Sequence, residues 1–205
     1  MNYFVAGIGT DVGKTVVSAV LVEALRADYW KPVQCGLPRD IDVVSSLVQN
    51  QSSNFHGETY LLNEPASPHQ AAHNQGLKLT VEAITAPKTK NDLVIEGSGG
   101  IMVPLNEQEF VLDLIKKFAD QVILVANLYL GSINHTLLSV DILQRHQIGI
   151  RGIVFNGISN SHSESVILSY SRSVKLLHLA PDSLIDTENI RKWAQILRKN
   201  LEMNS

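Results

Sequence analysis

The sequence has little cysteine, no surplus of basic residues and no long apolar run. Its 205 residues include one cysteine, Cys35, so a disulfide within the chain is excluded and a reducing compartment is favoured. The formal net charge of −3 provides no positive field to attract nucleic acid or an acidic membrane. No apolar run approaches the ~20 residues that cross a bilayer, and the first residues lack the features of a secretory signal. We therefore expect a soluble, cytoplasmic protein with neither nucleic-acid nor membrane partners.

The composition is that of a globular protein with a core. Hydrophobic residues make up 44% of the chain and charged residues 18%, and the length suits a single domain over residues 1–205. Short apolar runs predict strands at Tyr3–Ala6, Tyr29–Val33, Asp92–Glu96, Val122–Ala126, Ile153–Phe155 and Leu176–Leu179. Helices are expected at Lys14–Leu25, Asp40–Val48, Thr80–Ala86, Ile133–Gln144, Ser163–Val174 and Thr187–Leu201. Between them, Gln49–Gly76 is expected to be mostly loop with one short helical piece.

Strands that alternate with helices predict a fold class. The pattern is typical of a doubly wound, mostly parallel α/β sheet flanked by helices, of the P-loop NTPase type. Ligands of such sheets bind at the carboxyl ends of the strands. Residues placed just after the predicted strands are therefore the candidates for a functional site.

The strongest motif is a glycine-rich loop, Gly7–Thr15, between the first strand and the first helix. Gly13 lets the backbone approach a phosphate, and the amides that open the helix face one anion. Lys14 is expected to reach the outer phosphates, and the Thr15 hydroxyl to bind Mg²⁺. The strict pattern has glycine where Ile8 stands, so this is a variant loop. A plain glycine-rich turn is the alternative, which the flanking strand and helix disfavour.

Acidic residues and a lysine complete the candidate site. The metal-binding candidates are Asp11, Asp42 and Glu96, and Glu96 is favoured because it ends an apolar strand at the ligand-binding edge. Asp42 also suits a simple role at the start of a helix. Lys31 ends the second strand, where it acts either as a second cation for the transferred phosphoryl group or as a solvated lysine.

Five segments in the same order resemble the dethiobiotin synthetase family. They are Gly7–Thr15, Lys31-Pro32-Val33, Glu64–His69, Glu96–Gly100 and Leu130–His135. The resemblance spans the chain from Gly7 to about Gly157. Many enzymes share the glycine loop, whereas the Ser-Pro-His and Ile-Asn-His segments are more specific.

The resemblance implies a reaction and a cofactor. CO₂ adds to 7,8-diaminononanoate as a carbamate, ATP phosphorylates the carbamate, and the second amine closes a cyclic urea, dethiobiotin, with release of ADP and phosphate. Mg²⁺ is the implied cofactor. The implied catalytic residues are Lys31, Lys14 and Thr10, and the implied metal ligands are Thr15, Asp42 and Glu96.

The resemblance also implies binding residues and a partner. The nucleotide is expected at Asp11, Val12, Gly13, Lys14, Thr15, Val16, Asp42, Glu96, Gly97, Ser98 and Gly99, with Asn156 and Gly157 near the base. The substrate is expected at Lys31, Cys35, Gly131, Ser132, Ile133 and Asn134. In the family the contact from the last four residues comes from the neighbouring subunit, which implies a homodimer.

Two departures from the family pattern affect the predicted contacts. Cys35 stands where the family usually has serine or threonine, and a small buried apolar role is its alternative. The base-recognition loop is matched only by Leu179-Ala180-Pro181-Asp182, which leaves the selectivity for adenine open. His69 and His135 are interpreted as loop-ordering rather than catalytic residues, and the histidine spacing predicts no zinc site.

Two other functions compete with this interpretation. A related ATP-dependent amidoligase would carry a glutaminase domain with a nucleophilic cysteine, for which the chain is too short. A partitioning or positioning ATPase would carry a signature lysine early in the loop, where Gly9 stands, and often a basic membrane-binding helix. Phosphate release that depends on the diamine distinguishes the synthetase from such a switch.

Overall fold

The computed structural model describes residues 1–181 and 183–203, and its main feature is a seven-stranded sheet. The strand order is β4-β2-β6-β1-β7-β8-β9, and every paired ladder is parallel. These strands are β1 (Asn2–Gly7), β2 (Asp28–Trp30), β4 (Phe55–His56), β6 (Leu93–Gly100), β7 (Gln121–Leu128), β8 (Ile150–Gly157) and β9 (Lys175–Leu179). The predicted fold class is confirmed.

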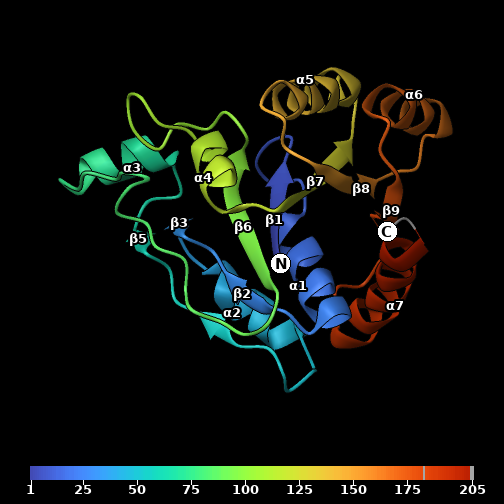
Figure 1. The fold of residues 1–205 in the computed structure, drawn as a ribbon, viewed down its shortest axis with the longest axis horizontal. Helices are drawn as coiled ribbons and strands as arrows, with labels where there is room; N and C mark the ends of the chain where they lie inside the picture. The colour runs from blue at the N-terminus through green and yellow to red at the C-terminus, as the bar shows by residue number, and fades with distance from the viewer. Residues whose placement is uncertain (182, 204–205) are drawn as a thin grey trace.

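Helices cover both faces of the sheet. The core on one face includes residues of α1 (Lys14–Leu25), α2 (Asp40–Leu47) and α7 (Thr187–Met203). The core on the other includes residues of α3 (Pro68–Asn74), α4 (Val111–Phe118), α5 (Ser132–Arg145) and α6 (Ser161–Ser171). Figure 1 shows α5 and α6 on one side of the sheet, and α1 and α7 on the other.

The central strand β1 contributes to both cores because its side chains alternate. Phe4 and Ala6 join one core, whereas Tyr3 and Val5 join the other. β1 lies between β6 and β7, and Val5 is in register with Glu96. The end of β1 and the end of β6 therefore lie side by side at one edge of the sheet, which brings the phosphate loop next to Glu96.

The predicted strand Tyr29–Val33 is two strands in different sheets. β2 ends at Trp30 in the main sheet, and β3 (Val33–Cys35) pairs with β5 (Tyr60–Leu62) in a separate two-stranded sheet. Pro32 has no N–H to donate to a ladder, and its carbonyl instead accepts the amides of Thr59 and Tyr60. Lys31 therefore lies at the point where the chain leaves the main sheet.

The predicted helix Thr80–Ala86 is wrong, since this segment is a turn over residues 81–83 with no regular structure on either side. The Lys117 ammonium, which comes from α4, donates to the carbonyls of Val81, Glu82 and Ile84. These carbonyls are thereby satisfied without a helix, while Val81 and Ile84 enter the core. The helical spacing of the apolar residues reflects this burial.

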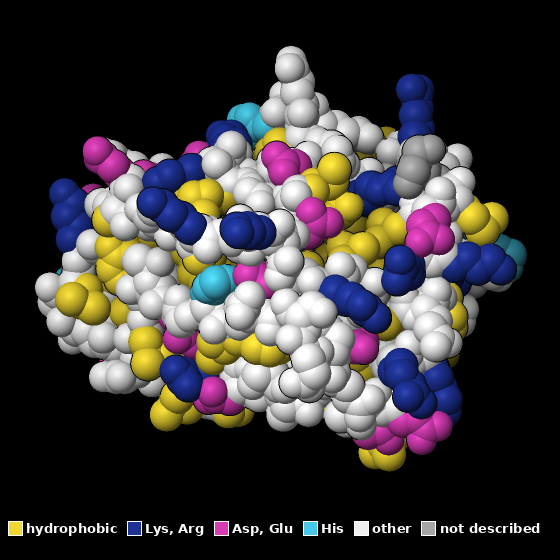
Figure 2. Space-filling view, turned by 60° about the horizontal axis from the view of Figure 1, so that its bottom comes forward, with side chains coloured by type: hydrophobic (Ala, Val, Ile, Leu, Met, Phe, Trp, Pro, Cys, Tyr) yellow, Lys and Arg dark blue, Asp and Glu magenta, His cyan; other side chains and the backbone are white. Residues whose placement is uncertain are grey.

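The surface carries mixed charge. Figure 2 shows basic and acidic side chains interspersed over one face of the molecule. Among the described residues, no helix combines the length and apolar character that crossing a membrane requires.

Candidate functional site

The phosphate loop, Gly7–Thr15, contains two glycines, Gly7 and Gly13, at which a Cβ would clash with neighbouring atoms. Gly13 has a φ of +97°, and a Cβ there would lie 2.6 Å from the Asn156 Nδ2 atom. A Cβ at Gly7 would lie 2.7 Å from the Val12 side chain. α1 begins directly after Gly13, so its first amides face the open end of the loop. This arrangement suits a bound anion, because free N–H groups and the positive end of the helix dipole coincide.

A cavity of about 700 Å³, here called the P-loop cavity, opens beside this loop. It is bounded by the phosphate loop, the end of β2, the turn after β3, the segment before α3 and the glycine-rich end of β6. Its lining residues are Thr10, Asp11, Gly13, Lys14, Thr15, Val16, Lys31, Gln34, Cys35, Pro38, Asp40, Pro65, Ala66, Ser67, Pro68, Glu96, Ser98, Gly99 and Val103.

Glu96 is the hydrogen-bonding centre of the P-loop cavity, and it is only 1% exposed. Its Oε1 accepts the Thr15 hydroxyl at 3.0 Å, and its Oε2 accepts the Tyr29 hydroxyl at 2.9 Å. Burial, with the neighbouring Glu96 carboxylate, raises the pKa of Tyr29 well above its usual value, so this hydroxyl stays a donor. The carboxylate is therefore held in one orientation, with Oε1 next to the phosphate loop.

Lys31 forms ion pairs with two carboxylates. Its Nζ donates to the Asp40 carboxylate and lies 3.4 Å from the Glu96 Oε1 atom. Burial lowers the pKa of Lys31, but the charges of Glu96 and Asp40 outweigh burial and raise the pKa overall. Gln34 fixes the start of α2, since its Oε1 accepts the Asp40 amide at 3.2 Å. The Lys31 ammonium is therefore a permanently charged group in the cavity wall.

Lys14 provides a second cation. Its Nζ donates to the Gly9 carbonyl at 3.0 Å, so the side chain folds back along its own loop. Burial lowers the pKa of Lys14, and the Glu96 carboxylate opposes this effect. Two lysines and the start of α1 thus offer positive charge to the same cavity, which suits a polyanionic ligand.

Cys35 lines the cavity as a neutral thiol. Burial raises the pKa of Cys35 to about 11, although the nearby Lys31 acts in the opposite direction. A thiol with this pKa is a poor nucleophile at neutral pH. The side chain is therefore suited to a packing or weak hydrogen-bonding contact.

Most of the predicted site residues line one cavity. The phosphate-loop residues Thr10, Asp11 and Gly13–Val16, together with Lys31, Cys35, Glu96, Ser98 and Gly99, all line the P-loop cavity. Val12 and Gly97 do not: Val12 is buried in the core, and a Cβ at Gly97 would lie 2.8 Å from the Phe4 ring. These two residues support the loops from the side that packs against the core.

Asp42 is not where the sequence interpretation placed it. Its carboxylate pairs with Arg39 at 2.7 Å, its side chain is 58% exposed, and it does not line the P-loop cavity. Asp40 lines the cavity instead and pairs with Lys31. Residues two apart on a helix point in different directions, so only one of the two can face the cavity. Sequence reasoning also missed Gln34, which carried no motif, and assigned no role to Ser67, although Ser67 belongs to the Ser-Pro-His segment.

A second cavity, of about 340 Å³, adjoins the phosphate loop through Gly13 and Val16. We call it the Trp193 cavity; it is lined by Gly13, Val16, Asn127, Asn156, Gly157, Leu179, Ala180, Pro181, Ser183, Ile185 and Trp193. The predicted residues Asn156 and Gly157 lie here, and so does most of the segment Leu179–Asp182; Asp182 itself lies outside the described residues. The Asn156 Nδ2 donates to the Val12 carbonyl at 3.0 Å, which joins β8 to the loop.

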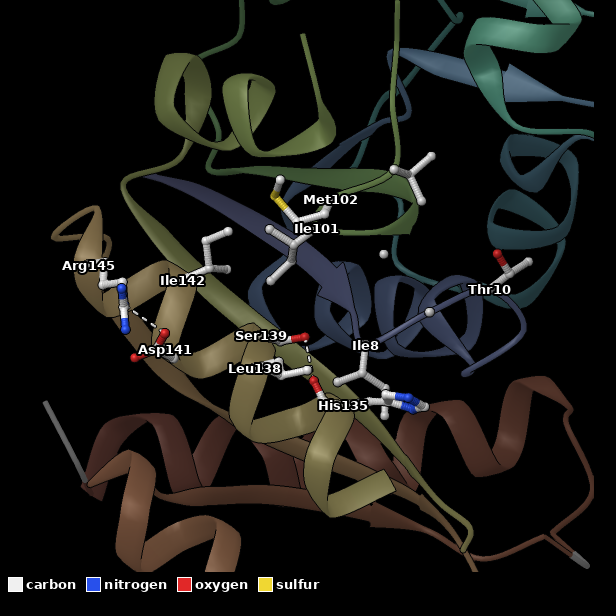
Figure 3. Close-up of a pocket in the computed structure, with 13 residues that line it drawn as sticks. Ile8, Thr10, Ile101, Met102, His135, Leu138, Ser139, Asp141, Ile142 and Arg145 are labelled. Atoms are coloured by element: carbon white, nitrogen blue, oxygen red, sulfur yellow. Dashed lines mark hydrogen bonds and ion pairs between the residues drawn. The ribbon is translucent and has the colours of Figure 1, made fainter. Parts of the chain in front are cut away.

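A third cavity, of about 600 Å³, lies between α5 and the end of β6. Figure 3 shows Ile142 on α5 turned toward Ile101, with an Asp141–Arg145 ion pair at one end. Thr10 and Val103 line both this cavity and the P-loop cavity. The predicted substrate residues Gly131–Asn134 line none of the three cavities, although they open α5 nearby.

The fold and the phosphate loop define a class, the P-loop nucleotide-binding proteins. The chain matches the AAA domain family over residues 1–189. Its fold resembles the cell division ATPase MinD of Pyrococcus furiosus (TM-score 0.60, 14% identity, 100% of this chain and 99% of the other covered). It also resembles the septum site-determining protein MinD of Pyrococcus horikoshii (TM-score 0.58, 15% identity, 99% and 96% covered).

Comparison of the sequence with known proteins identifies a more specific family. The chain is 49% identical to the ATP-dependent dethiobiotin synthetase BioD of Cytophaga hutchinsonii, with 97% of this chain and 98% of the relative covered. It is 46% identical to the protein of the same name from Christiangramia forsetii, with 98% and 97% covered. The chain therefore belongs to the ATP-dependent dethiobiotin synthetase family.

Proposed function

We propose that this protein carries out the ATP-dependent carboxylation and ring closure of 7,8-diaminononanoate with CO₂ to form dethiobiotin, a step of biotin biosynthesis in the cytoplasm. The observation that carries the proposal is the pair of lysines, Lys14 and Lys31, in one cavity with the start of α1. A carbamate oxygen leaves poorly until it is phosphorylated. The two cations stabilise the charge that moves with the γ-phosphoryl group.

The proposed metal is Mg²⁺, held by the Thr15 hydroxyl and the carboxylates of Glu96 and Asp40. Hard oxygen donors of this kind are the ligands that Mg²⁺ prefers. The Lys31 ammonium already pairs with both carboxylates. This pairing supports the proposal that a cation binds favourably beside them. When bound, the metal would neutralise phosphate charge. Asp40 takes the role that the sequence interpretation gave to Asp42.

The nucleotide is proposed to extend from the P-loop cavity into the Trp193 cavity. Gly13 and Val16 line both cavities, so a ligand with phosphates at the start of α1 has its base beside Asn156 and Gly157. Lys31 is proposed to contact the carbamate, since it lines the same cavity as the phosphate-binding groups. Thr10 and Cys35 line the remaining wall, where the substrate chain is expected.

A homodimer with shared sites is also proposed. Gly131–Asn134 open α5 but do not line the P-loop cavity of their own chain, so their contact with the substrate carboxylate requires a second copy. Leu130 beside them is fully exposed and Tyr129 is half exposed, which suits burial against a partner. The amides at the start of α5 then hold the carboxylate of a substrate bound in the partner's cavity.

Mixed dimers test the shared site. Lys31→Ala removes the cation of one chain's cavity, and Asn134→Asp adds a repelling charge to the start of its α5. Equal mixing of the two variants, after dissociation and reassociation, is expected to restore about a quarter of wild-type activity, because half of the dimers then carry one intact site. No restoration contradicts the shared site.

Product analysis tests the reaction itself. The protein is incubated with the diamine, ¹³C-labelled bicarbonate, Mg²⁺ and ATP, and mass spectrometry is expected to find labelled dethiobiotin. Phosphate release is expected to depend on the diamine, whereas a positioning ATPase would release phosphate without it. Lys31→Ala is expected to abolish most turnover while the circular dichroism spectrum stays unchanged. Near-normal turnover of this variant would contradict the role of Lys31.

A further inference from the structure

We propose that Ser67 and His69 form a proton relay that accepts the proton of the attacking amine during ring closure. The inference rests on the proposed function and adds the group that removes this proton. Ser67 lines the P-loop cavity, and its Oγ lies 3.0 Å from the His69 Nδ1 atom. We call these two residues the Ser67–His69 pair.

The Ser67 side chain does not make the hydrogen bond that a serine at the start of a helix usually makes. Ser67 is the N-cap residue of α3, but its hydroxyl accepts no hydrogen bond from the helix amides. Only its backbone carbonyl serves the helix, by accepting the amides of Gln70 and Ala71 at 3.0 Å. The hydroxyl is instead hydrogen-bonded to the His69 ring, so a residue of the cavity wall is paired with an imidazole.

The pair is fixed in place on both sides. The His69 amide donates to the Pro104 carbonyl at 3.3 Å, which ties the start of α3 to the loop after β6. The segment before Ser67 packs against the turn that follows Cys35, since a Cβ at Gly36 would lie 2.8 Å from the Pro65 side chain. His69 is exposed, so its ring exchanges protons with water. The relay thus connects the cavity to solvent.

Other groups in the wall are poorly suited to accept this proton. Lys14 and Lys31 are ammonium donors, and Glu96 is engaged by Thr15 and Tyr29. Asp40 is paired with Lys31, and the Ser98 hydroxyl donates to the Val33 carbonyl. Asp11 belongs to the phosphate loop, where the nucleotide phosphates are proposed to bind.

Ring closure forms one bond, breaks another and moves one proton to His69. The amine nitrogen forms a bond to the carbamate carbon, and the bond from that carbon to the phosphate oxygen breaks, so phosphate leaves with the electron pair. The nitrogen gives its proton to the Ser67 Oγ while the Ser67 hydroxyl proton passes to His69 Nδ1. The tautomer of His69 that carries its proton on Nε2 is the one that can accept at Nδ1. The imidazolium then returns a proton to water.

The test compares product formation with ADP formation in single variants. In Ser67→Ala and His69→Gln, product formation is expected to fall about 10²-fold in kcat, at the lower end of what a proton acceptor contributes, with the KM for ATP unchanged. ADP is expected to exceed product, because an activated carbamate that is not closed is hydrolysed. Ser67→Thr keeps the hydroxyl and is expected to restore both kcat and the one-to-one ratio.

Control experiments distinguish loss of the relay from a folding defect and from failure of the proposed function. His73→Gln changes an exposed histidine on the same helix and is expected to match the wild type. The double variant is expected to lose no more than either single variant, since the two residues act as one unit. A wild type that makes no labelled product contradicts the proposed function and the relay with it. A wild type that makes product, with a Ser67→Ala variant that keeps its kcat and coupling, overturns the relay alone.

Discussion

The Asn156 carboxamide donates from Nδ2 to the Val12 carbonyl at 3.0 Å and lies directly behind Gly13. Any side chain at position 13 would meet this nitrogen, and the φ of +97° disfavours such a side chain independently. The end of β8 therefore sets the shape of a loop about 140 residues earlier in the chain. Shape, rather than charge alone, prepares the start of α1 for a phosphate.

Gly13→Ala is expected to reduce ATP affinity at least tenfold, because the loop must move away from Asn156. Gly9→Ala is the matched control, since a Cβ there meets only the Val12 side chain at 4.0 Å. Isothermal titration calorimetry with ATP and Mg²⁺ measures both. Equal affinities of the two variants would contradict the steric argument.

Asp40→Asn and Asp42→Asn are expected to have very different effects on activity, although the two residues are only two positions apart. Asp40 lines the cavity beside Lys31, whereas Asp42 pairs with Arg39 at the surface. Asp40→Asn is expected to lower kcat about 10²-fold and to raise the Mg²⁺ concentration needed for half-maximal activity. Asp42→Asn is expected to stay close to the wild type. Magnesium titrations of both variants decide which carboxylate is the ligand.

Asp28 is expected to make stability depend on pH. It is 1% exposed and joins β2 to neighbouring segments by hydrogen bonds from Asn54, Asn91 and His56. Burial alone raises the pKa of Asp28, but these hydrogen bonds outweigh it and hold the pKa well below its usual 3.8. Because the folded pKa is depressed, the stabilisation is present above pH 4 and is lost as the pH falls below it.

Asp28→Asn is therefore expected to cost about 2 kcal/mol at pH 7, the scale of hydrogen bonds to a buried charge. The difference from the wild type is expected to shrink below pH 4. Urea unfolding at several pH values measures it. Asp92→Asn, which removes an exposed ion pair with the amino terminus, is the control and is expected to change little.

Ser18→Ala is expected not to destabilise the protein. The Ser18 hydroxyl is fully buried in α1 and has no hydrogen-bond partner among the described residues. Its removal relieves a desolvation cost of about 1 kcal/mol, and alanine favours the helix. Ser171→Ala is the matched change, because the buried Ser171 hydroxyl bonds to Leu168 and Ser173. Thermal unfolding is expected to show a lower midpoint only for Ser171→Ala.

The sequence predicted the centre of the fold well because local signals there agree. The apolar run before Gly7, the glycine loop and the apolar spacing after Lys14 place β1 and α1 correctly. Outside this centre, the structure of some segments depends on contacts between residues far apart in the sequence. Lys117 satisfies the carbonyls of the segment that was predicted to be a helix, and no local pattern near Val81 reveals a lysine 36 residues away.

The position of Glu96 was predictable from the sequence, whereas the choice between residues on a helix was not. Glu96 follows the apolar residues Leu93-Val94-Ile95, and although β6 continues to Gly100 rather than ending at Glu96, the glutamate still lies beside the phosphate loop. The choice between Asp40 and Asp42 depends on the rotation of α2, which Gln34 fixes through the Asp40 amide. The role of Ser67 depends on the His69 ring, a contact that the residues in order do not reveal.

The break between β2 and β3 has a consequence for how this chain tolerates length changes. Lys31 is directed into the cavity by the count of residues between Trp30, held in the seven-stranded sheet, and Val33, held in the small one. Side chains along an extended segment alternate in direction, so one inserted or deleted residue would turn the ammonium away while both sheets stayed paired. We expect such a variant to fold normally and to be inactive.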